Sequence, residues 1–170
     1  MCCNAYTKEF TDYALVMRPR LRRQAFLLCG DWHEADDLAQ DTLVTLYRRW
    51  PELDRHARLD GYAHTVLTRR FCSVRRHLRW RREVSHAEPP EQPQRRDNDV
   101  VELRLSLQAE LERLPPRQRA VIVLRFWHDL SIDQVAARMS TSPGTVASQC
   151  RKALTTLRGN LMDHRPVLNG

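Results

Sequence analysis

The segment from Ser131 to Arg158 constrains the fold of this chain most, because it predicts two short helices joined by a tight turn. Ser131 and Gln134 form the pattern of a capping box at the start of the first helix. Ser142 followed by Pro143 predicts the start of the second helix, since serine caps helix N-termini and proline is accepted at the first helical position. Such a pair is typical of a helix-turn-helix unit, whose second helix enters the major groove of DNA.

The two sides of the second helix differ in chemistry. Its apolar positions at helical spacing, which we expect to face inward, are Val146, Cys150, Leu154 and Leu157. Gly159 is expected to end this helix. Its outward positions are polar or basic and comprise Thr145, Ser148, Gln149, Arg151 and Lys152. A helical hairpin inside any all-α protein is the alternative, but the serine–proline cap, the small residues at the helix crossing and the basic outer face together favour DNA.

The charge of the chain points to a polyanionic partner. Its 170 residues include 28 basic and 21 acidic side chains, which gives a formal net charge of +7. The excess is concentrated between Gly61 and Arg82, where seven arginines occur without an acidic residue. Arginine suits phosphate because its planar guanidinium donates two parallel hydrogen bonds. A solvated basic helix face is the alternative, and the arginine run alone does not decide between them.

Several other classes of protein are disfavoured by the sequence. No apolar run approaches the roughly 18 residues that span a bilayer, and the first residues do not resemble a secretory signal. We therefore expect a cytoplasmic protein without membrane insertion, whose five cysteines stay reduced. The cysteines form no CxxC pair, and the chain has no phosphate-binding loop, so we expect no metal, no cofactor and no catalytic residue. Cys72 and Cys150 are expected to act as small apolar residues.

The first half of the chain predicts three helices, at about residues 7–29, 31–50 and 59–81. Pro19 is expected to bend or divide the first of them. Asp31 and Glu34 predict a capping box for the second. The apolar stripe expected on the third helix comprises Ala63, Val66, Leu67, Phe71, Val74 and Leu78. Phe71 is interpreted as a core residue.

The second half begins after a proline-rich segment at residues 83–98, which lacks the apolar residues needed to fold and predicts a flexible linker. A capping box at Asp99 and Glu102 is expected to start the next helix. The inner face of that helix is expected to comprise Leu103, Leu107, Leu111 and Leu114. The next helix is expected to run from Arg117 to Trp127. These patterns predict an all-α fold of two small helical domains, residues 5–82 and 99–160, joined by the flexible linker.

Taken together, these features resemble the extracytoplasmic-function sigma factors of bacterial RNA polymerase, in particular an actinobacterial SigE-like group. The resemblance rests on LLCGDWHEADDLAQDTLVTLYRRW at residues 27–50 and LPPRQRAVIVLRFWHDLS at residues 114–131, and it covers about residues 7–159. It implies a region 2 bundle followed by a region 4 helix-turn-helix. It further implies a non-enzymatic protein that binds core RNA polymerase and directs transcription initiation at promoters.

The resemblance implies roles for three groups of residues. Those expected to dock on the β′ clamp helices of the polymerase are Asp37, Gln40, Asp41, Leu43, Thr45 and Arg48. Those expected to hold the −10 promoter element, by stacking on bases and contacting phosphates, are Tyr62, His64, Arg69, Arg70, Arg75 and Arg76. The −35 element is assigned to the five outward residues of the second helix of the helix-turn-helix, with phosphate contacts from Arg117 and Arg119.

The chain departs from the family pattern at four positions. Arg69 and Ser73 stand where asparagine and aspartate are common, and Ala147 or Gln149 stands where many relatives carry a basic residue. The implied partners also include the polymerase β flap and, as a candidate, an anti-sigma factor, with association with the nucleoid in the holoenzyme. An autonomous helix-turn-helix regulator and a partner-binding protein without DNA are the alternatives. The acidic face near Asp37 and the arginine-rich helix argue against the former.

Overall fold

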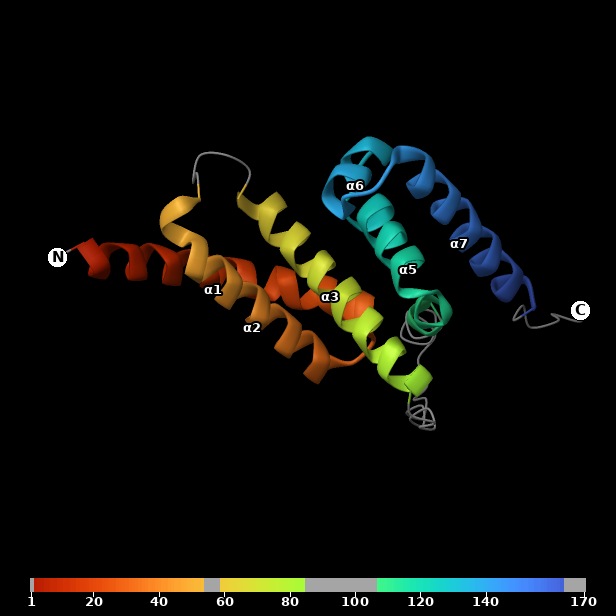
Figure 1. Cartoon of the computed structure of the whole chain (residues 1–170), viewed down its shortest axis with the longest axis horizontal. Helices are drawn as coiled ribbons and strands as arrows, with labels where there is room; N and C mark the ends of the chain where they lie inside the picture. The colour runs from red at the N-terminus through yellow and green to blue at the C-terminus, as the bar shows by residue number, and fades with distance from the viewer. Residues whose placement is uncertain (1, 54–58, 85–106, 164–170) are drawn as a thin grey trace, which may run out of the picture. The chain divides into compact units, whose positions relative to one another are not determined.

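The structure, a computed structural model, describes residues 2–53, 59–84 and 107–163. All regular secondary structure within these ranges is helical (Figure 1), so the all-α fold class is confirmed. The chain divides into two compact units, Met1–Leu78 and Arg79–Gly170. The described residues of each unit form helices.

Some sequence expectations fall outside the described residues. The linker expected at residues 83–98 is outside them from position 85 onward. The cap expected at Asp99 and Glu102, and the inward position expected for Leu103, are outside them entirely. The boundaries of the two domains along the sequence therefore stay predictions.

The first unit consists of α1 (Cys2–Cys29), α2 (Trp32–Arg49), a short 3-10 turn (Trp50–Glu52) and most of α3 (Leu59–Val84). α1 and α2 pack side by side (Figure 1). α1 continues through Pro19 as one helix and is not divided there. Pro19 is exposed, and the buried residues Met17 and Leu21 lie two positions before and after it, so packing of the apolar stripe offsets the helical hydrogen bond that proline removes.

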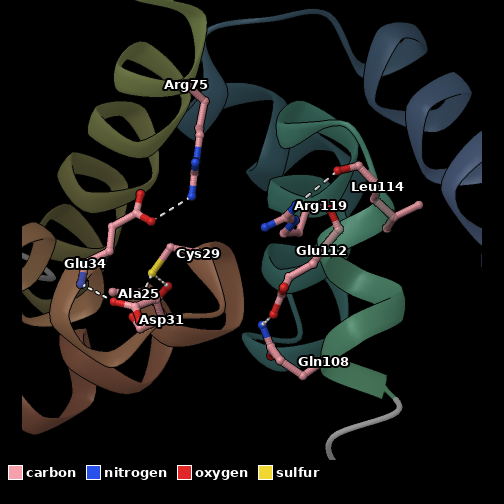
Figure 2. A network of polar contacts seen from close by, with 9 residues as sticks. All are labelled: Ala25, Cys29, Asp31, Glu34, Arg75, Gln108, Glu112, Leu114 and Arg119. Carbon is pink, nitrogen blue, oxygen red and sulfur yellow. Dashed lines mark hydrogen bonds and ion pairs between the residues drawn. The ribbon is translucent and has the colours of Figure 1, made fainter. Parts of the chain in front are cut away.

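The turn between α1 and α2 matches the sequence prediction in part. Gly30 has a φ of 81° and donates its N–H to the Phe26 carbonyl at 2.8 Å. Asp31 caps α2 by accepting the N–H of Glu34 at 2.8 Å. The Glu34 carboxylate, which a capping box would direct back to the backbone, instead accepts a hydrogen bond from Arg75 of α3 (Figure 2). The expected capping box is therefore a simple N-cap, because a charged donor on α3 attracts the carboxylate.

The core of the first unit is formed by apolar stripes on all three helices. Its buried members are Met17, Leu21, Ala25, Leu28, Leu38, Leu46, Trp50, Ala63, Leu67 and Phe71. Phe71 is only 2% exposed, which confirms its interpretation as a core residue. Val74, expected on the same stripe, is 41% exposed. The buried line on α3 advances in steps of four residues through Ala63, Leu67 and Phe71, and Val74 lies to one side of that line.

Cys29 belongs to this core at the end of α1. Its thiol donates a hydrogen bond to the Ala25 carbonyl at 2.9 Å (Figure 2). Burial raises the pKa of the Cys29 thiol to about 11, so the group is neutral near pH 7. A buried, protonated thiol acts in packing rather than as a nucleophile. Cys150 is half-buried and packs against the core of the second unit, as expected for a small apolar residue.

The second unit consists of a helix at residues 107–113, α5 (Pro116–Ile122), a π-helical turn (Val123–Trp127), α6 (Ile132–Met139) and α7 (Pro143–Asp163). α6 and α7 form the helix-turn-helix, coloured in blue shades in Figure 1. The core beneath it comprises Val121, Leu124, Leu130, Val135, Ala136 and Val146. Residues of α5, α6 and α7 thus share one small core.

The caps and the turn of the helix-turn-helix form as the sequence predicts. Ser131 Oγ accepts the N–H of Gln134 at 3.1 Å, and Gln134 Oε1 accepts the N–H of Ser131 at 2.8 Å, which completes the capping box. Ser140 lies in the turn with a φ of 49°. Ser142 Oγ accepts the N–H of Thr145 at 3.2 Å and so caps α7.

Two expectations for α7 are wrong. Leu154 is 41% exposed, and Ala153 is buried instead. The reason is the helical repeat, because steps of four, three and four residues from Val146 keep Ala153 on the buried side of the helix, whereas a second step of four turns Leu154 away from it. Gly159 does not end the helix, which continues beyond it. Asn160 donates a hydrogen bond to the buried carboxylate of Glu110, and this contact holds the last turns of α7 against the first helix of the unit.

The inner face of the helix at residues 107–113 also differs from the prediction. Leu111 and Leu114 are buried as expected, but Leu107 is 48% exposed. Gln108 is buried in its place and donates to Glu112 Oε1 at 3.2 Å (Figure 2). The buried side of the helix continues from Leu111 to Gln108, three residues earlier in the chain, and not to Leu107, four residues earlier. Leu107 therefore faces solvent.

Arg119 joins the helix at residues 107–113 to α5. It is only 7% exposed, and its Nη2 donates to the Leu114 carbonyl at 3.3 Å and to the Glu112 carbonyl (Figure 2). Arg117 is exposed, because two residues turn a helix by about 200°. The expected phosphate contact from Arg119 therefore does not fit the structure, since backbone carbonyls already hold its guanidinium.

We expect Arg119→Gln to lower the free energy of unfolding by about 1.5–3 kcal/mol, because hydrogen bonds from a charged donor are lost. Arg117→Gln is the matched control and should change it by less than about 0.5 kcal/mol, as surface substitutions usually do. Urea titration of the full chain, followed by circular dichroism, measures both variants. Equal effects of the two substitutions would contradict the structural role of Arg119.

Candidate nucleic-acid interface

The outward side of α7 is polar over its first turns. Four of the five predicted residues share one helix face by their spacing, namely Thr145, Ser148, Gln149 and Lys152. Arg151 borders this face. Arg151 and Lys152 are exposed, and the other three side chains are half-buried. The five predicted residues therefore lie together on the side of α7 that borders the buried line of Val146, Ala153 and Leu157.

Arg151 and Lys152 also line a shallow groove between α7 and the start of α5. The groove has a volume of about 460 Å³, and its other lining residues are Pro115, Gln118, Thr155 and Thr156. Cationic, amide and hydroxyl side chains of this kind are the usual partners of a DNA phosphate backbone. Arg117 is exposed in the same first turn of α5. The groove thus extends the polar face of α7 with groups that suit phosphate.

Three predicted residues of α3 form a single stripe, which we call the α3 stripe: Tyr62, Arg69 and Arg76. They recur every seven residues and so share one helix face. Both arginines are exposed, and the half-buried Tyr62 accepts a hydrogen bond at its Oη from Arg49 Nη1 at 2.9 Å. Ser73, one of the positions that depart from the family pattern, is half-buried on the same face. The stripe aligns an aromatic ring with two guanidinium groups.

Arg70 and Arg75 flank the α3 stripe and contact acidic residues of α2. Arg70 donates from Nε and Nη2 to Asp41 Oδ2, at 3.0 and 2.5 Å. Arg75 donates from Nη2 to Glu34 Oε2 at 2.8 Å (Figure 2). The four side chains are 26–53% exposed, so both ion pairs are screened by salt and are modest in strength. A predicted DNA residue, Arg70, is thus bonded to a predicted docking residue, Asp41.

His64 lies apart from the α3 stripe. Its Nδ1 is hydrogen-bonded to Oε1 of the fully buried Gln24, whose Nε2 donates to Thr68 Oγ1 at 2.9 Å. Because His64 is two residues from Tyr62, it points about 200° around the helix from it. The structure therefore does not bring His64 together with the other residues predicted to hold the −10 element.

The exposed side of α2 carries four of the six predicted docking residues. Together with Val44, they form what we call the α2 face: Asp37, Gln40, Asp41, Val44 and Arg48. Val44 is 42% exposed at its centre. The sequence interpretation did not single it out, although its spacing of seven residues from Asp37 predicts a shared face.

The other two predicted docking residues are half-buried. Leu43 lines a groove of about 680 Å³ between α1 and α2, together with residues such as Phe10 and Leu15. Thr45 donates its hydroxyl to the Asp41 carbonyl at 2.9 Å. Leu43 therefore contributes to the groove between α1 and α2, and Thr45 bonds within α2 itself.

Neither metal binding nor membrane insertion finds support in the described part of the chain. Within it, no three histidine, cysteine or acidic side chains gather in a way that could hold a metal ion. None of the helices described is both long enough and apolar enough to cross a membrane.

Two known sequence families match successive parts of the chain. Sigma-70 region 2 matches residues 15–81, which include α2 and most of α3. Sigma-70 region 4 matches residues 104–157, which include α6 and most of α7. The two matches fall in the order that the sequence resemblance implies.

Similar proteins agree with these matches. The RNA polymerase sigma-E factor of Streptomyces coelicolor is 34% identical over 159 residues, which cover 91% of this chain and 86% of the relative. The ECF RNA polymerase sigma factor SigE of Mycolicibacterium smegmatis is 31% identical over 151 residues. The matched region covers 85% of this chain and 58% of that relative. In fold, the chain is similar to the sigma factor RpoE of Bartonella quintana, solved in complex with the anti-sigma factor NepR. That likeness has a TM-score of 0.69 at 24% identity and covers 93% of this chain and 99% of that one.

The two family matches coincide with the helical surfaces described above. The helix-turn-helix of the second unit lies within the region 4 match, and the α2 face and the α3 stripe lie within the region 2 match. Identity to the Streptomyces relative extends over nearly the whole of both chains. The chain therefore belongs to the sigma-70 family of RNA polymerase sigma factors, in the extracytoplasmic-function group that includes the sigma-E factors of actinobacteria.

Proposed function

We propose that this chain is a promoter-specificity subunit, which binds core RNA polymerase and directs transcription initiation without performing covalent chemistry. The observation that carries the proposal is the presence of a region 2 unit and a region 4 unit in one chain. Each unit presents a polar or basic face on a helix whose other side is buried. Such a chain recognises a promoter at two places while it is bound to the polymerase.

The −35 element is read by α7. Gln149 is suited to adenine, since a side-chain amide forms two hydrogen bonds with that base in the major groove. Arg151 and Lys152 hold phosphates from the groove beside α5, and Arg117 supports them from the first turn of α5. Arg119 is left out of this set, because it is buried and held by backbone carbonyls.

The opened −10 element is held by the α3 stripe. The ring of Tyr62 stacks on an unpaired base, while Arg69 and Arg76 contact phosphates of the same strand. Arg70 and Arg75 lie at the sides of the stripe and contribute charge to it when their ion pairs with α2 open. Gln24 engages His64 from within the core, so we assign His64 no contact with DNA.

The β′ clamp helices dock on the α2 face. Asp37 and Asp41 offer carboxylates to basic side chains of the polymerase, and Val44 offers an apolar centre between them. The β flap is the expected partner of the second unit. An anti-sigma factor is a further partner, by analogy with the complex of RpoE and NepR. The chain then acts in the bacterial cytoplasm, on the nucleoid as part of the holoenzyme.

Reconstituted transcription tests the function as a whole. Purified core polymerase with this chain should start transcription at a set of genomic sites that core polymerase alone does not use. Sequencing of RNA 5′ ends from a genomic template measures the difference. Identical start sites with and without the chain would contradict the proposal. Tight binding of the chain alone to duplex promoter DNA, in a gel shift, would instead favour an autonomous regulator.

The double substitution Gln40→Ala and Asp41→Ala should reduce co-purification with core polymerase by at least about tenfold, because it removes a carboxylate and an amide from the centre of an interface. Glu52→Ala is the matched control, since it removes an exposed acid outside the α2 face. Affinity capture of core polymerase on the tagged chain measures both variants. Undiminished capture by the double variant would refute the docking assignment.

Gln149→Ala should change the preferred −35 sequence, with a loss of roughly 1–3 kcal/mol of discrimination at one base pair. Thr155→Ala on the same helix is the control and should leave the preference unchanged. Transcription by the holoenzyme from a library with a randomised −35 element gives the preference of each variant. The same preferred sequence for Gln149→Ala and for the unaltered chain would show that Gln149 does not read a base.

A further inference from the structure

The ion pair between Asp41 and Arg70 connects two surfaces that the proposed function treats separately. Asp41 belongs to the α2 face, and Arg70 lies beside the α3 stripe, 29 residues further along the chain. Arg70 donates two hydrogen bonds to the same oxygen of Asp41, at 3.0 and 2.5 Å. The two side chains are 42% and 53% exposed, so an incoming partner can reach either of them.

While it is paired, Arg70 is poorly suited to bind a phosphate. Asp41 already takes up the Nε–H and one of the Nη2–H donors, and these form one of the two edges of the guanidinium that can bind an oxyanion with two bonds. A phosphate that approached this side would also meet the negative charge of Asp41. Arg70 therefore contributes less to the attraction of DNA in this arrangement than its position beside the stripe would allow.

We propose that Asp41 restrains Arg70 in the free chain, and that a basic side chain of a docking partner releases it by binding Asp41 in its place. The released guanidinium then contacts a phosphate of single-stranded DNA beside the α3 stripe. This inference rests on the proposed function, since it takes the α2 face as a docking surface and α3 as a DNA surface. It adds that docking on one surface strengthens binding at the other through one ion pair.

The neighbouring pair differs from this one in exposure. Glu34 and Arg75 form a similar ion pair, and Glu34 stands in the first turn of α2, seven residues before Asp41 and on the same side of the helix. Figure 2 shows that pair beside Cys29 and Asp31, where α1 and α2 meet. The Arg75 side chain is 26% exposed against 42% for Arg70, so a partner on the α2 face reaches the Asp41 pair more readily than the Glu34 pair.

Asp41→Asn in the full chain tests the restraint without any polymerase. Asp37→Asn is the matched control, because it removes the same charge from the same helix face, and no ion pair of Asp37 is found among the described residues. In fluorescence anisotropy with a labelled single-stranded oligonucleotide, D41N should bind about two- to fivefold more tightly than D37N, the range expected for an exposed ion pair. The affinity of D41N should also fall more steeply with salt than that of D37N. The slope of log affinity against log salt concentration should be steeper by about 0.7, because one further phosphate contact is formed.

Adding Arg70→Gln tests whether the gain in affinity comes from Arg70. In the D41N chain, R70Q should remove the gain, so that the double variant binds single-stranded DNA like D37N with R70Q. Equal affinities of D41N and D37N would overturn the proposal, and so would a gain that survives R70Q. Circular dichroism confirms that each variant is folded as the parent chain is.

The release by a partner is tested in the holoenzyme. R70Q should weaken binding of a single-stranded −10 oligonucleotide by about two- to fivefold in the holoenzyme, but by less than about 1.5-fold in the free chain. The same loss in both would overturn the coupling. A chain that does not bind core polymerase at all would overturn the proposed function, whereas the comparison of D41N with D37N contains no polymerase and is judged independently.

Discussion

Burial of an apolar line on each helix is the constraint on which the remaining structure depends. On α3 this line runs through Ala63, Leu67 and Phe71, which are at most 2% exposed. Once these residues face the core, the helical repeat turns Arg69 and Arg76 outward and leaves Arg70 and Arg75 at the sides. The placement of charge on α3 is thus a consequence of hydrophobic packing, not of attraction between charges.

The second unit follows the same logic with a smaller core. The buried side chains of α6 and α7 near their crossing are Val135, Ala136 and Val146, whose compact shapes let the helices approach closely. The capping box at Ser131 and the left-handed Ser140 set the directions in which α6 begins and ends. This core and the contact of Asn160 with Glu110 hold α7, and with it the polar face of that helix, in place.

Electrostatic contacts add a second level of organisation. Basic side chains of α3 pair with acidic side chains of α2 at exposed positions, where each pair contributes little to stability, about 0–1 kcal/mol. Weak pairs of this kind exchange partners readily, because a phosphate or a basic side chain can replace either member at low cost. Arg119 differs from these exposed arginines. It is buried, and its guanidinium is hydrogen-bonded to backbone carbonyls, so it does not exchange partners readily.

The sequence by itself determined the helical class, the caps at Asp31, Ser131 and Ser142 and the family, because these depend on local spacing and on short motifs. Only the tertiary structure decided which residues at the edge of a predicted face are buried, as Ala153 and Leu154 show. It also decided the partners of long side chains, since Arg70, Arg75 and Arg119 can each reach several groups. Helical periodicity defines a direction around one axis, but whether a residue meets a neighbour or solvent in that direction depends on how the helices pack.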